Sequence, residues 1–288
     1  MMHAQQYRPT SCLAAIVVAA TLGGCTGLGG LGGLSEAEPD ANAASTSTNI
    51  ASLTEVVQRN PNDPQAYNVR GAVLGRAGRN EEALADFNKA LTINPAFAQA
   101  YANRGLIHRQ MKKLDLALAD YNKAVEIEPS YAAAYVGRGM VYRQQGQAML
   151  AFADFNKAIE LKPDNAQAYY NRGLLYQAQA QHQYAIDDFT TAIPLAGQHA
   201  EARVARAQSY LANNDNQAAT SDLDEAVQIE PHNLQAWTTR GLAYERLGDK
   251  EKAAGSYAQA LSIKKDYEPA RKGFARVGGK AGQAYATF

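Results

Sequence analysis

The sequence has little cysteine, and both of its cysteines, Cys12 and Cys25, lie close to the N-terminus. The rest of the chain therefore cannot form a disulfide bond, present a thiolate nucleophile or build a cysteine metal site. The five histidines show no metal-ligand spacing, and the sequence contains no Gly-rich phosphate loop and no HExxH motif. We therefore expect no enzyme activity, no metal and no cofactor.

The sequence also lacks a net charge, because 28 Lys and Arg residues balance 28 Asp and Glu residues. Proteins that bind nucleic acid need a basic surface to neutralise phosphate groups. The balance gives no sign of such a surface, and we expect no nucleic-acid partner.

An uncharged apolar run at residues 12–22 is too short to cross the roughly 30 Å hydrocarbon core of a bilayer as a helix. It follows Arg8, in the order that is typical of an N-terminal targeting segment. We expect residues 1–24 to be such a segment and to be removed from the mature chain.

The main feature of the sequence is a period of 34 residues. An arginine followed by glycine recurs at this spacing, and the fifth copy has Arg206-Ala207 instead. Sixteen residues after the glycine position stands an aromatic residue or leucine, and three residues later an alanine. The glycines are Gly71, Gly105, Gly139, Gly173 and Gly241, and the alanines are Ala90, Ala124, Ala158, Ala192, Ala226 and Ala260. A fixed period of this length indicates an array of stacked supersecondary units.

Within each copy, spacings of three and four residues place the aromatic and small residues on one face of a helix, so each copy predicts two helices joined by a turn. The pattern resembles the tetratricopeptide repeat (TPR). The resemblance implies an all-α solenoid, a right-handed superhelix of six helix-turn-helix repeats with a concave groove lined by the first helices. The repeats would span residues 64–97, 98–131, 132–165, 166–199, 200–233 and 234–267.

Both ends of the array carry partial copies. Residues 50–63 resemble half a repeat, with Leu53 and Val56 at the core positions of a second helix. Residues 268–288 begin with a first-type helix and end in a tail. We expect both segments to cap the exposed ends of the stack.

The fifth copy departs most from the pattern, and Pro194 is expected to end the helix before it three residues early. Two interpretations remain open. The changes are neutral drift, or they alter the superhelical pitch and shape a surface for a partner or for a second copy.

Arginine precedes the glycine position in every copy, and aspartate precedes the aromatic position in five of them. We expect Arg–Asp pairs between the two helices of a repeat that hold the repeat together. The alternative is a charged track for a partner.

The groove positions of the first helices combine apolar residues with Arg and Gln. This composition suits a peptide with apolar side chains and an acidic group that meets Arg109 or Arg143. The alternative is that the apolar residues pack between neighbouring helices. The candidate groove residues are Leu106, Arg109, Val136, Met140, Arg143, Tyr170, Leu174, Gln177 and Val204.

Residues 22–25, Leu-Gly-Gly-Cys, resemble the lipobox of bacterial lipoproteins. This resemblance implies a diacylglycerol thioether on Cys25, cleavage before it and acylation of the new N-terminus, with palmitate as the acyl chain. By the same resemblance, Thr26 points to the outer membrane. Residues 25–49 would form a flexible tether. The alternative is an ordinary secretory signal that leaves one free cysteine.

Together, the lipobox, the tether and the repeat array resemble the outer-membrane TPR lipoproteins of the NlpI type. The resemblance implies a lipid-anchored scaffold that faces the periplasm and binds proteins or peptides, as an adaptor for peptidoglycan hydrolases and a protease. The alternative is an assembly factor for a pilus or a secretion system. A homodimer through residues 50–63 or through the fifth copy is a further hypothesis.

Overall fold

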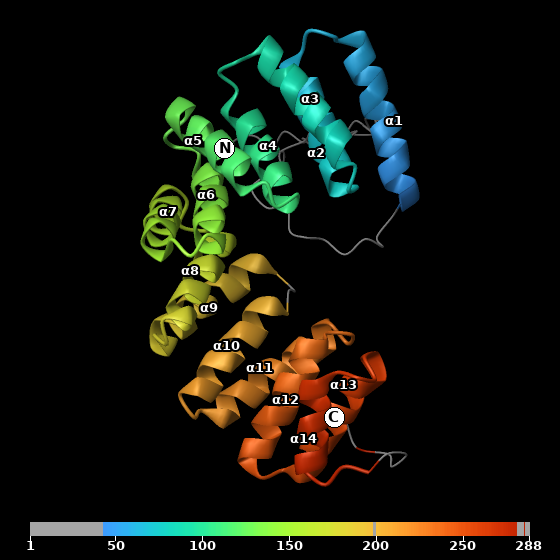
Figure 1. Cartoon of the computed structure of the whole chain (residues 1–288), viewed down its shortest axis with the longest axis vertical. Helices are drawn as coiled ribbons and strands as arrows, with labels where there is room; N and C mark the ends of the chain where they lie inside the picture. The colour runs from blue at the N-terminus through green and yellow to red at the C-terminus, as the bar shows by residue number, and fades with distance from the viewer. Residues whose placement is uncertain (1–42, 198–199, 281–284, 286–288) are drawn as a thin grey trace, which may run out of the picture. The chain divides into compact units, whose positions relative to one another are not determined.

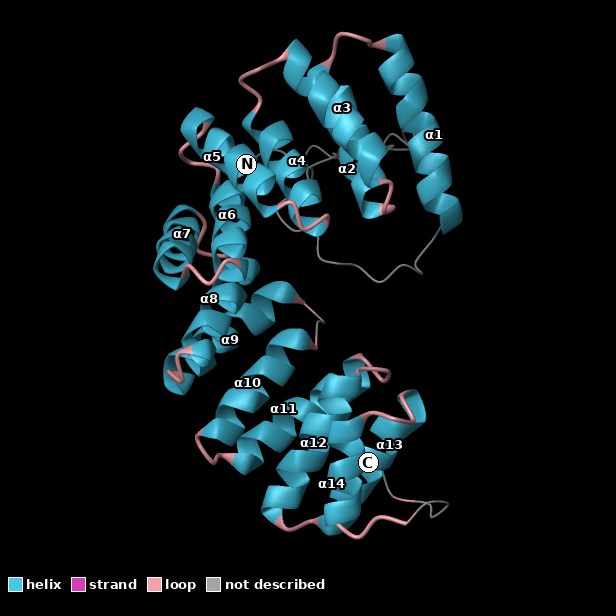
Figure 2. Ribbon diagram, in the orientation of Figure 1, coloured by secondary structure: helices cyan, strands magenta, loops and turns pink. Residues whose placement is uncertain are grey.

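A computed structural model describes residues 43–197, 200–280 and 285. Within them the chain forms fourteen helices and no strand, which confirms the predicted all-α fold (Figures 1 and 2). The targeting segment, the lipobox with Cys25 and the first part of the tether lie outside the described residues.

The helices follow one another as pairs between two single helices. We call the first helix of each pair the A helix and the second the B helix. The single helices are α1 (Ala43–Arg59) and α14 (Glu268–Arg276). The A helices are α2 (Pro64–Arg76), α4 (Ala98–Gln110), α6 (Ala132–Gln144), α8 (Ala166–Ala178), α10 (Glu201–Ala212) and α12 (Leu234–Leu247). The B helices are α3 (Asn80–Ile93), α5 (Leu114–Ile127), α7 (Ala148–Leu161), α9 (His182–Ala196), α11 (Asn216–Ile229) and α13 (Lys250–Ile263).

Helices contact only near neighbours along the chain, as expected for a solenoid. Each A helix contacts its own B helix, the B helix before it and the A helices of the adjacent repeats. Successive B helices do not contact one another in the described part of the chain. The A helices therefore lie on the inner side of the stack and the B helices on the outer side. None of the described helices is both long and apolar enough to cross a bilayer.

The glycines of the repeat allow the ring of the B helix to lie against the A helix. A Cβ atom built on Gly71, Gly139 or Gly173 would lie 2.7–2.8 Å from the ring of the phenylalanine in its own repeat. The fifth repeat has Ala207 at this place, and there the ring is replaced by the smaller Leu223, which is fully buried. The two changes in this repeat therefore compensate each other.

The expected Arg–Asp pairs are present in five repeats, and they hold more than one repeat together. Arg138 donates from Nε and Nη2 to both carboxylate oxygens of Asp154, at 2.8 and 2.7 Å. Its remaining nitrogen, Nη1, donates to Asn122 of the preceding B helix at 2.9 Å. The arginines of the second to fifth repeats thus each join an A helix to two B helices. The other four pairs are Arg70–Asp86, Arg104–Asp120, Arg172–Asp188 and Arg206–Asp222.

The last repeat keeps the arginine but reverses its partners. Arg240 forms its ion pair with Asp224 of the preceding B helix, at 2.6 Å. Toward its own B helix it donates to the hydroxyl of Ser256, at 2.9 Å. The charge pair has moved from within one repeat to the junction between two repeats.

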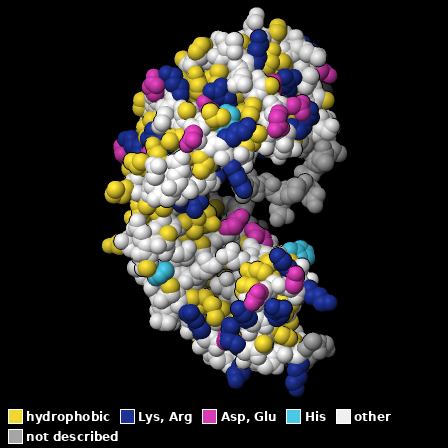
Figure 3. Space-filling view, in the orientation of Figure 1, with side chains coloured by type: hydrophobic (Ala, Val, Ile, Leu, Met, Phe, Trp, Pro, Cys, Tyr) yellow, Lys and Arg dark blue, Asp and Glu magenta, His cyan; other side chains and the backbone are white. Residues whose placement is uncertain are grey.

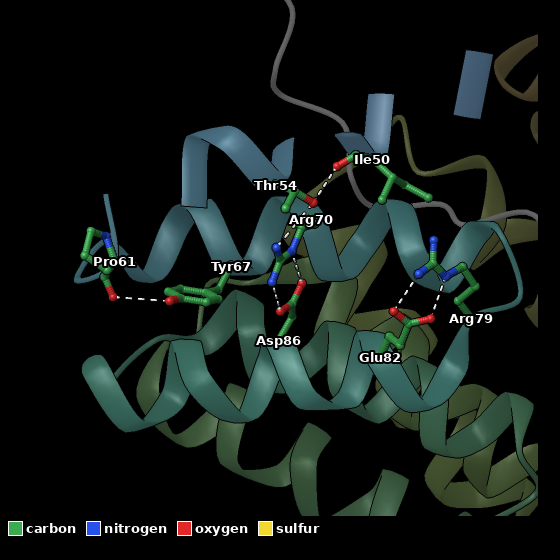
Figure 4. A network of polar contacts seen from close by, with 8 residues as sticks. All are labelled: Ile50, Thr54, Pro61, Tyr67, Arg70, Arg79, Glu82 and Asp86. Carbon is green, nitrogen blue, oxygen red and sulfur yellow. Dashed lines mark hydrogen bonds and ion pairs between the residues drawn. The ribbon is translucent and has the colours of Figure 1, made fainter. Parts of the chain in front are cut away.

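Helix α1 takes the place of a B helix before the first repeat (Figure 4). Arg70 binds Asp86 on one side and donates to Thr54 of α1 on the other, at 3.4 Å. Tyr67 donates its hydroxyl hydrogen to the carbonyl oxygen of Pro61, in the turn between α1 and α2. Both contacts tie α1 to the first A helix.

Two details of α1 differ from our expectations. The helix begins at Ala43, so residues 43–49 are helical and do not belong to a flexible tether. Val57, which is 6% exposed, is the buried valine, whereas Val56 is 42% exposed. The reason is that α1 has no A helix of its own, so the side that carries Val56 is left without cover.

The expectation for Pro194 was wrong, because α9 continues through this proline to Ala196 and is longer than the other B helices. A proline in the last turn of a helix removes only one of the final hydrogen bonds. It therefore disturbs the helix less than a proline in the interior would. The residue that caps the end of the helix is Gly197, which has a φ of 77°.

Candidate partner-binding face

The predicted groove residues lie on the A helices, at positions five, nine and twelve counted from the first residue of each repeat. We call this surface the A-helix face. Leu106, Met140 and Leu174 occupy position nine of three consecutive repeats, and all three are half-buried. An apolar strip therefore runs across α4, α6 and α8 with part of its surface open to a partner.

Several of the predicted residues are used in packing between helices. Val136 and Val204 are only 3% and 4% exposed. Gln177 donates from Nε2 to the carbonyl oxygen of Ala205 and to the hydroxyl of Ser209, both at 3.0 Å. These three side chains join neighbouring A helices, so the packing alternative describes them better than partner binding does.

Arg109 and Arg143 occupy position twelve of the second and third repeats, and they differ from the arginines that precede the glycine positions. Arg109 is 8% exposed, and Arg143 is half-buried. The Nε atoms of both are buried without a hydrogen-bond partner, and neither forms an ion pair with a described residue. Two guanidinium groups are thus held on one face without a counter-charge.

The two arginines influence the electrostatics of the A-helix face. Burial lowers the pKa of the Arg143 guanidinium, Tyr170 acts in the opposite direction, and the charge of Arg109 lowers it further. Burial raises the pKa of the Tyr170 hydroxyl, an effect to which Glu201 adds and which Arg143 reduces. The site is electropositive and partly desolvated.

Tyr121 also belongs to this cluster, although the repeat pattern identified it only as the aromatic residue of its second helix. A Cβ atom on Gly137 of α6 would lie 2.2 Å from its ring, so only glycine leaves room for the tyrosine. Burial raises the pKa of the Tyr121 hydroxyl far above its usual range, and Arg109 offsets part of this rise. The sequence did contain a sign of this contact. Where the aromatic position holds tyrosine instead of phenylalanine, the following helix carries a glycine against its ring, as Gly137 does for Tyr121 and Gly273 for Tyr257.

A second group of exposed apolar residues lies on the B helices and was also not predicted. Met149 is 86% exposed, Tyr184 60%, Leu116 52% and Leu150 48%. They stand at the start of α5, α7 and α9, away from the A-helix face. On the side of the molecule that Figure 3 shows, hydrophobic side chains are interspersed with basic and acidic ones.

No cluster that could hold a metal ion occurs among the described residues. His108, at a position where four other repeats have tyrosine, lies 3.8 Å from Asp120. Burial lowers its pKa, and the charge of Asp120 acts against this. The imidazole is a packing residue beside the Arg104–Asp120 pair.

Four family models match the chain, each described as a tetratricopeptide or TPR repeat. They cover residues 76–112 with 139–179, 98–131, 166–199 and 204–269. Together they span more than half of the chain. No curated protein sequence matches it.

Solved structures with the same fold include a chain of the APC/C hetero-tetramer Cut9–Hcn1, with a TM-score of 0.72 and 18% identity over 81% of this chain. The match covers 46% of that longer chain, so the likeness concerns the repeats alone. PilF of Pseudomonas aeruginosa matches with a TM-score of 0.68 and 20% identity, over 74% of this chain and 97% of its own.

A third solved structure, YrrB, is described as a TPR protein with an unusual peptide-binding site. It matches with a TM-score of 0.54 and 27% identity, over 65% of this chain and 96% of its own. The helix pairs, the glycine–aromatic contacts and these matches agree, and the chain belongs to the tetratricopeptide-repeat proteins.

Proposed function

We propose that this protein is a membrane-anchored periplasmic scaffold that binds protein partners on its A-helix face. TPR arrays are platforms for protein–protein interaction, and a fold of this kind needs no chemistry of its own. The observation that carries the proposal is the half-buried apolar strip of Leu106, Met140 and Leu174. Partly exposed apolar residues in a row, with charged groups beside them, suit an extended or helical segment of a partner.

The proposed place of the protein follows from the sequence around Cys25. Its resemblance to a lipobox supports lipid attachment there and a position at the outer membrane, facing the periplasm. Tethering raises the local concentration of bound partners, to the mM range for short flexible linkers. The role we favour is that of an adaptor that brings peptidoglycan hydrolases and a processing protease together at the envelope.

A second candidate function, assembly of a pilus or a secretion system, would use the same face and the same anchor. The likeness to PilF, at 20% identity, supports a shared fold. The two candidates differ only in the partner, and the same experiment separates them.

The test is crosslinking in intact cells, purification through a C-terminal tag and mass spectrometry of the proteins recovered. Met140→Glu should abolish recovery, because it replaces an apolar contact of the strip with a charged, hydrated side chain. Met149→Glu, at a methionine of α7 that is 86% exposed, is the matched control and should leave recovery unchanged.

Recovery of hydrolases or a protease supports the adaptor role, and recovery of pilus or secretion components supports the second candidate. Equal recovery with Met140→Glu would show that the A-helix face is not the binding surface. In a parallel arm, Cys25→Ser should release the protein from the membrane fraction; unchanged membrane association would overturn the lipid anchor.

A further inference from the structure

We infer that Arg109 and Arg143 together form a site for one carboxylate, supplied by an acidic side chain within the partner's bound segment. This inference rests on the proposed function and specifies the chemistry of the partner. It starts from the contrast between these two arginines and those that precede the glycine positions, which are paired with aspartate in five of the six repeats.

A buried guanidinium group without a counter-charge is unfavourable, because its hydration is lost and nothing replaces it. Arg109 is 8% exposed, and its Nε atom has no acceptor. Arg143 occupies the same position of the next repeat, and the charge of Arg109 lowers the pKa of its guanidinium group. An anion between them would relieve both costs, and the donor-rich, planar guanidinium group suits a carboxylate in particular.

The described residues offer no internal anion for this position. Glu201 is the acidic residue whose charge acts on Tyr170, at the edge of the cluster, but it forms no ion pair with either arginine. The hydroxyl of Tyr121 stands beside Arg109 and is neutral, since its pKa is raised by burial. Tyr121 therefore supplies no counter-charge to Arg109.

The surroundings indicate what kind of segment carries the carboxylate. Leu106 and Met140 lie one helical turn from Arg109 and Arg143 on the same two helices, and Tyr170 and Leu174 continue the face on α8. On the other side, the corresponding positions of α2 are the small residues Ala72 and Gly75, which are buried against α4. Because half-buried apolar residues lie beside both arginines and continue onto α8, the site suits an acidic residue within an apolar segment.

The experiment uses the full chain and two peptide libraries with amidated C-termini, in which a central Glu or a central Gln is flanked by random apolar residues. We expect the Glu library to be retained at least about ten-fold better, as a charge-assisted contact allows. Arg143→Gln and Arg109→Gln should remove this preference. Arg76→Gln, at an exposed arginine of α2, should keep it.

The outcomes separate the inference from the proposed function. Equal retention of both libraries, lost with Met140→Glu, would overturn the carboxylate site and leave the binding face in place. No retention of either library, or retention that Met140→Glu does not change, would overturn both. Thermal unfolding of each variant shows whether a lost preference for the Glu library comes from an unfolded protein. If the Gln variants are unfolded, Arg143→Lys, which keeps the charge, must retain part of the preference.

Two further arms identify the source of the carboxylate. A Gln library with free C-termini that binds as well as the Glu library would overturn the assignment to an interior side chain. The chain's own acidic residues before α1 are Glu36, Glu38 and Asp40. If their replacement by amides raised retention of the Glu library about ten-fold, the site would be occupied by this segment, and the assignment to a partner would be wrong.

Discussion

Gly173 shows how one missing side chain sets the distance between the two helices of a repeat. A Cβ atom there would lie 2.7 Å from Cε1 of Phe189, closer than non-bonded carbon atoms approach. The fifth repeat has solved the same problem differently, with Ala207 opposite Leu223. The two arrangements are alternative solutions of one packing constraint, which makes the pair testable.

We predict that Gly173→Ala destabilises α8 and α9. Overpacking against the Phe189 ring costs about 1–3 kcal/mol. The better helix propensity of alanine offsets up to about 1 kcal/mol of this cost. Phe189→Leu alone should also destabilise, because it leaves a void. The double variant reproduces the arrangement of the fifth repeat, and its loss should be smaller than the two single losses added.

Amide hydrogen exchange in α8 and α9 measures this locally, as is needed in an array whose repeats open separately. We expect a coupling free energy on the order of 1 kcal/mol between the two substitutions. Losses that simply add would mean that the ring and the missing Cβ are independent.

At the scale of the helices, the Arg–Asp pairs act as joints between repeats. Arg138 connects α6 to Asp154 of α7 and to Asn122 of α5. The Asp154 side chain is only 6% exposed, so it depends on this arginine for its charge compensation. A surface pair of the same chemistry, Arg79 with Glu82, joins residues within one turn of the chain and connects no helices.

We predict that Arg138→Gln costs about 3–5 kcal/mol, because it leaves a buried carboxylate without a partner. The matched variant Arg79→Gln should lower the free energy of unfolding far less, because the side chains of Arg79 and of its partner Glu82 are both solvated. Urea denaturation followed by the helical circular dichroism signal compares the two. Similar losses for both variants would show that burial does not decide the strength of these pairs.

The sequence predicted the helices and the Arg–Asp pairs because both depend on regular spacings. It did not predict that each arginine also reaches a residue of the preceding B helix, or that Val57 rather than Val56 is buried in α1. Those features depend on how one repeat lies against the next. Pro194 was misjudged for a related reason, because a local rule was applied to the last turn of a helix, where its cost is small.

The candidate site could also be predicted only as far as it follows from regular spacing, and not where it depends on how one repeat lies against the next. The repeat positions identified the residues that face the inner side, including Arg109 and Met140. They could not distinguish Val136, which is buried between helices, from Met140, which stays partly open. They assigned Tyr121 to the packed face of its helix, but not to the binding face, because its place depends on the missing side chain of Gly137 in the next repeat.

At the scale of the whole molecule, the described array offers a partner two distinct apolar surfaces. The A-helix face carries half-buried apolar residues beside two unpaired arginines, whereas the starts of α5, α7 and α9 carry strongly exposed ones, such as Met149. Hot spots of interfaces lie in partly enclosed, desolvated places rather than on isolated protruding side chains. Our account therefore assigns the partner to the A-helix face.

The most direct test of this assignment is site-specific photo-crosslinking in intact cells, with a photoreactive amino acid in place of Met140 or, separately, of Met149. The account predicts that position 140 forms a covalent product with a second protein and that position 149 does not. A product from position 149 alone would contradict the account and place the partner on the B helices.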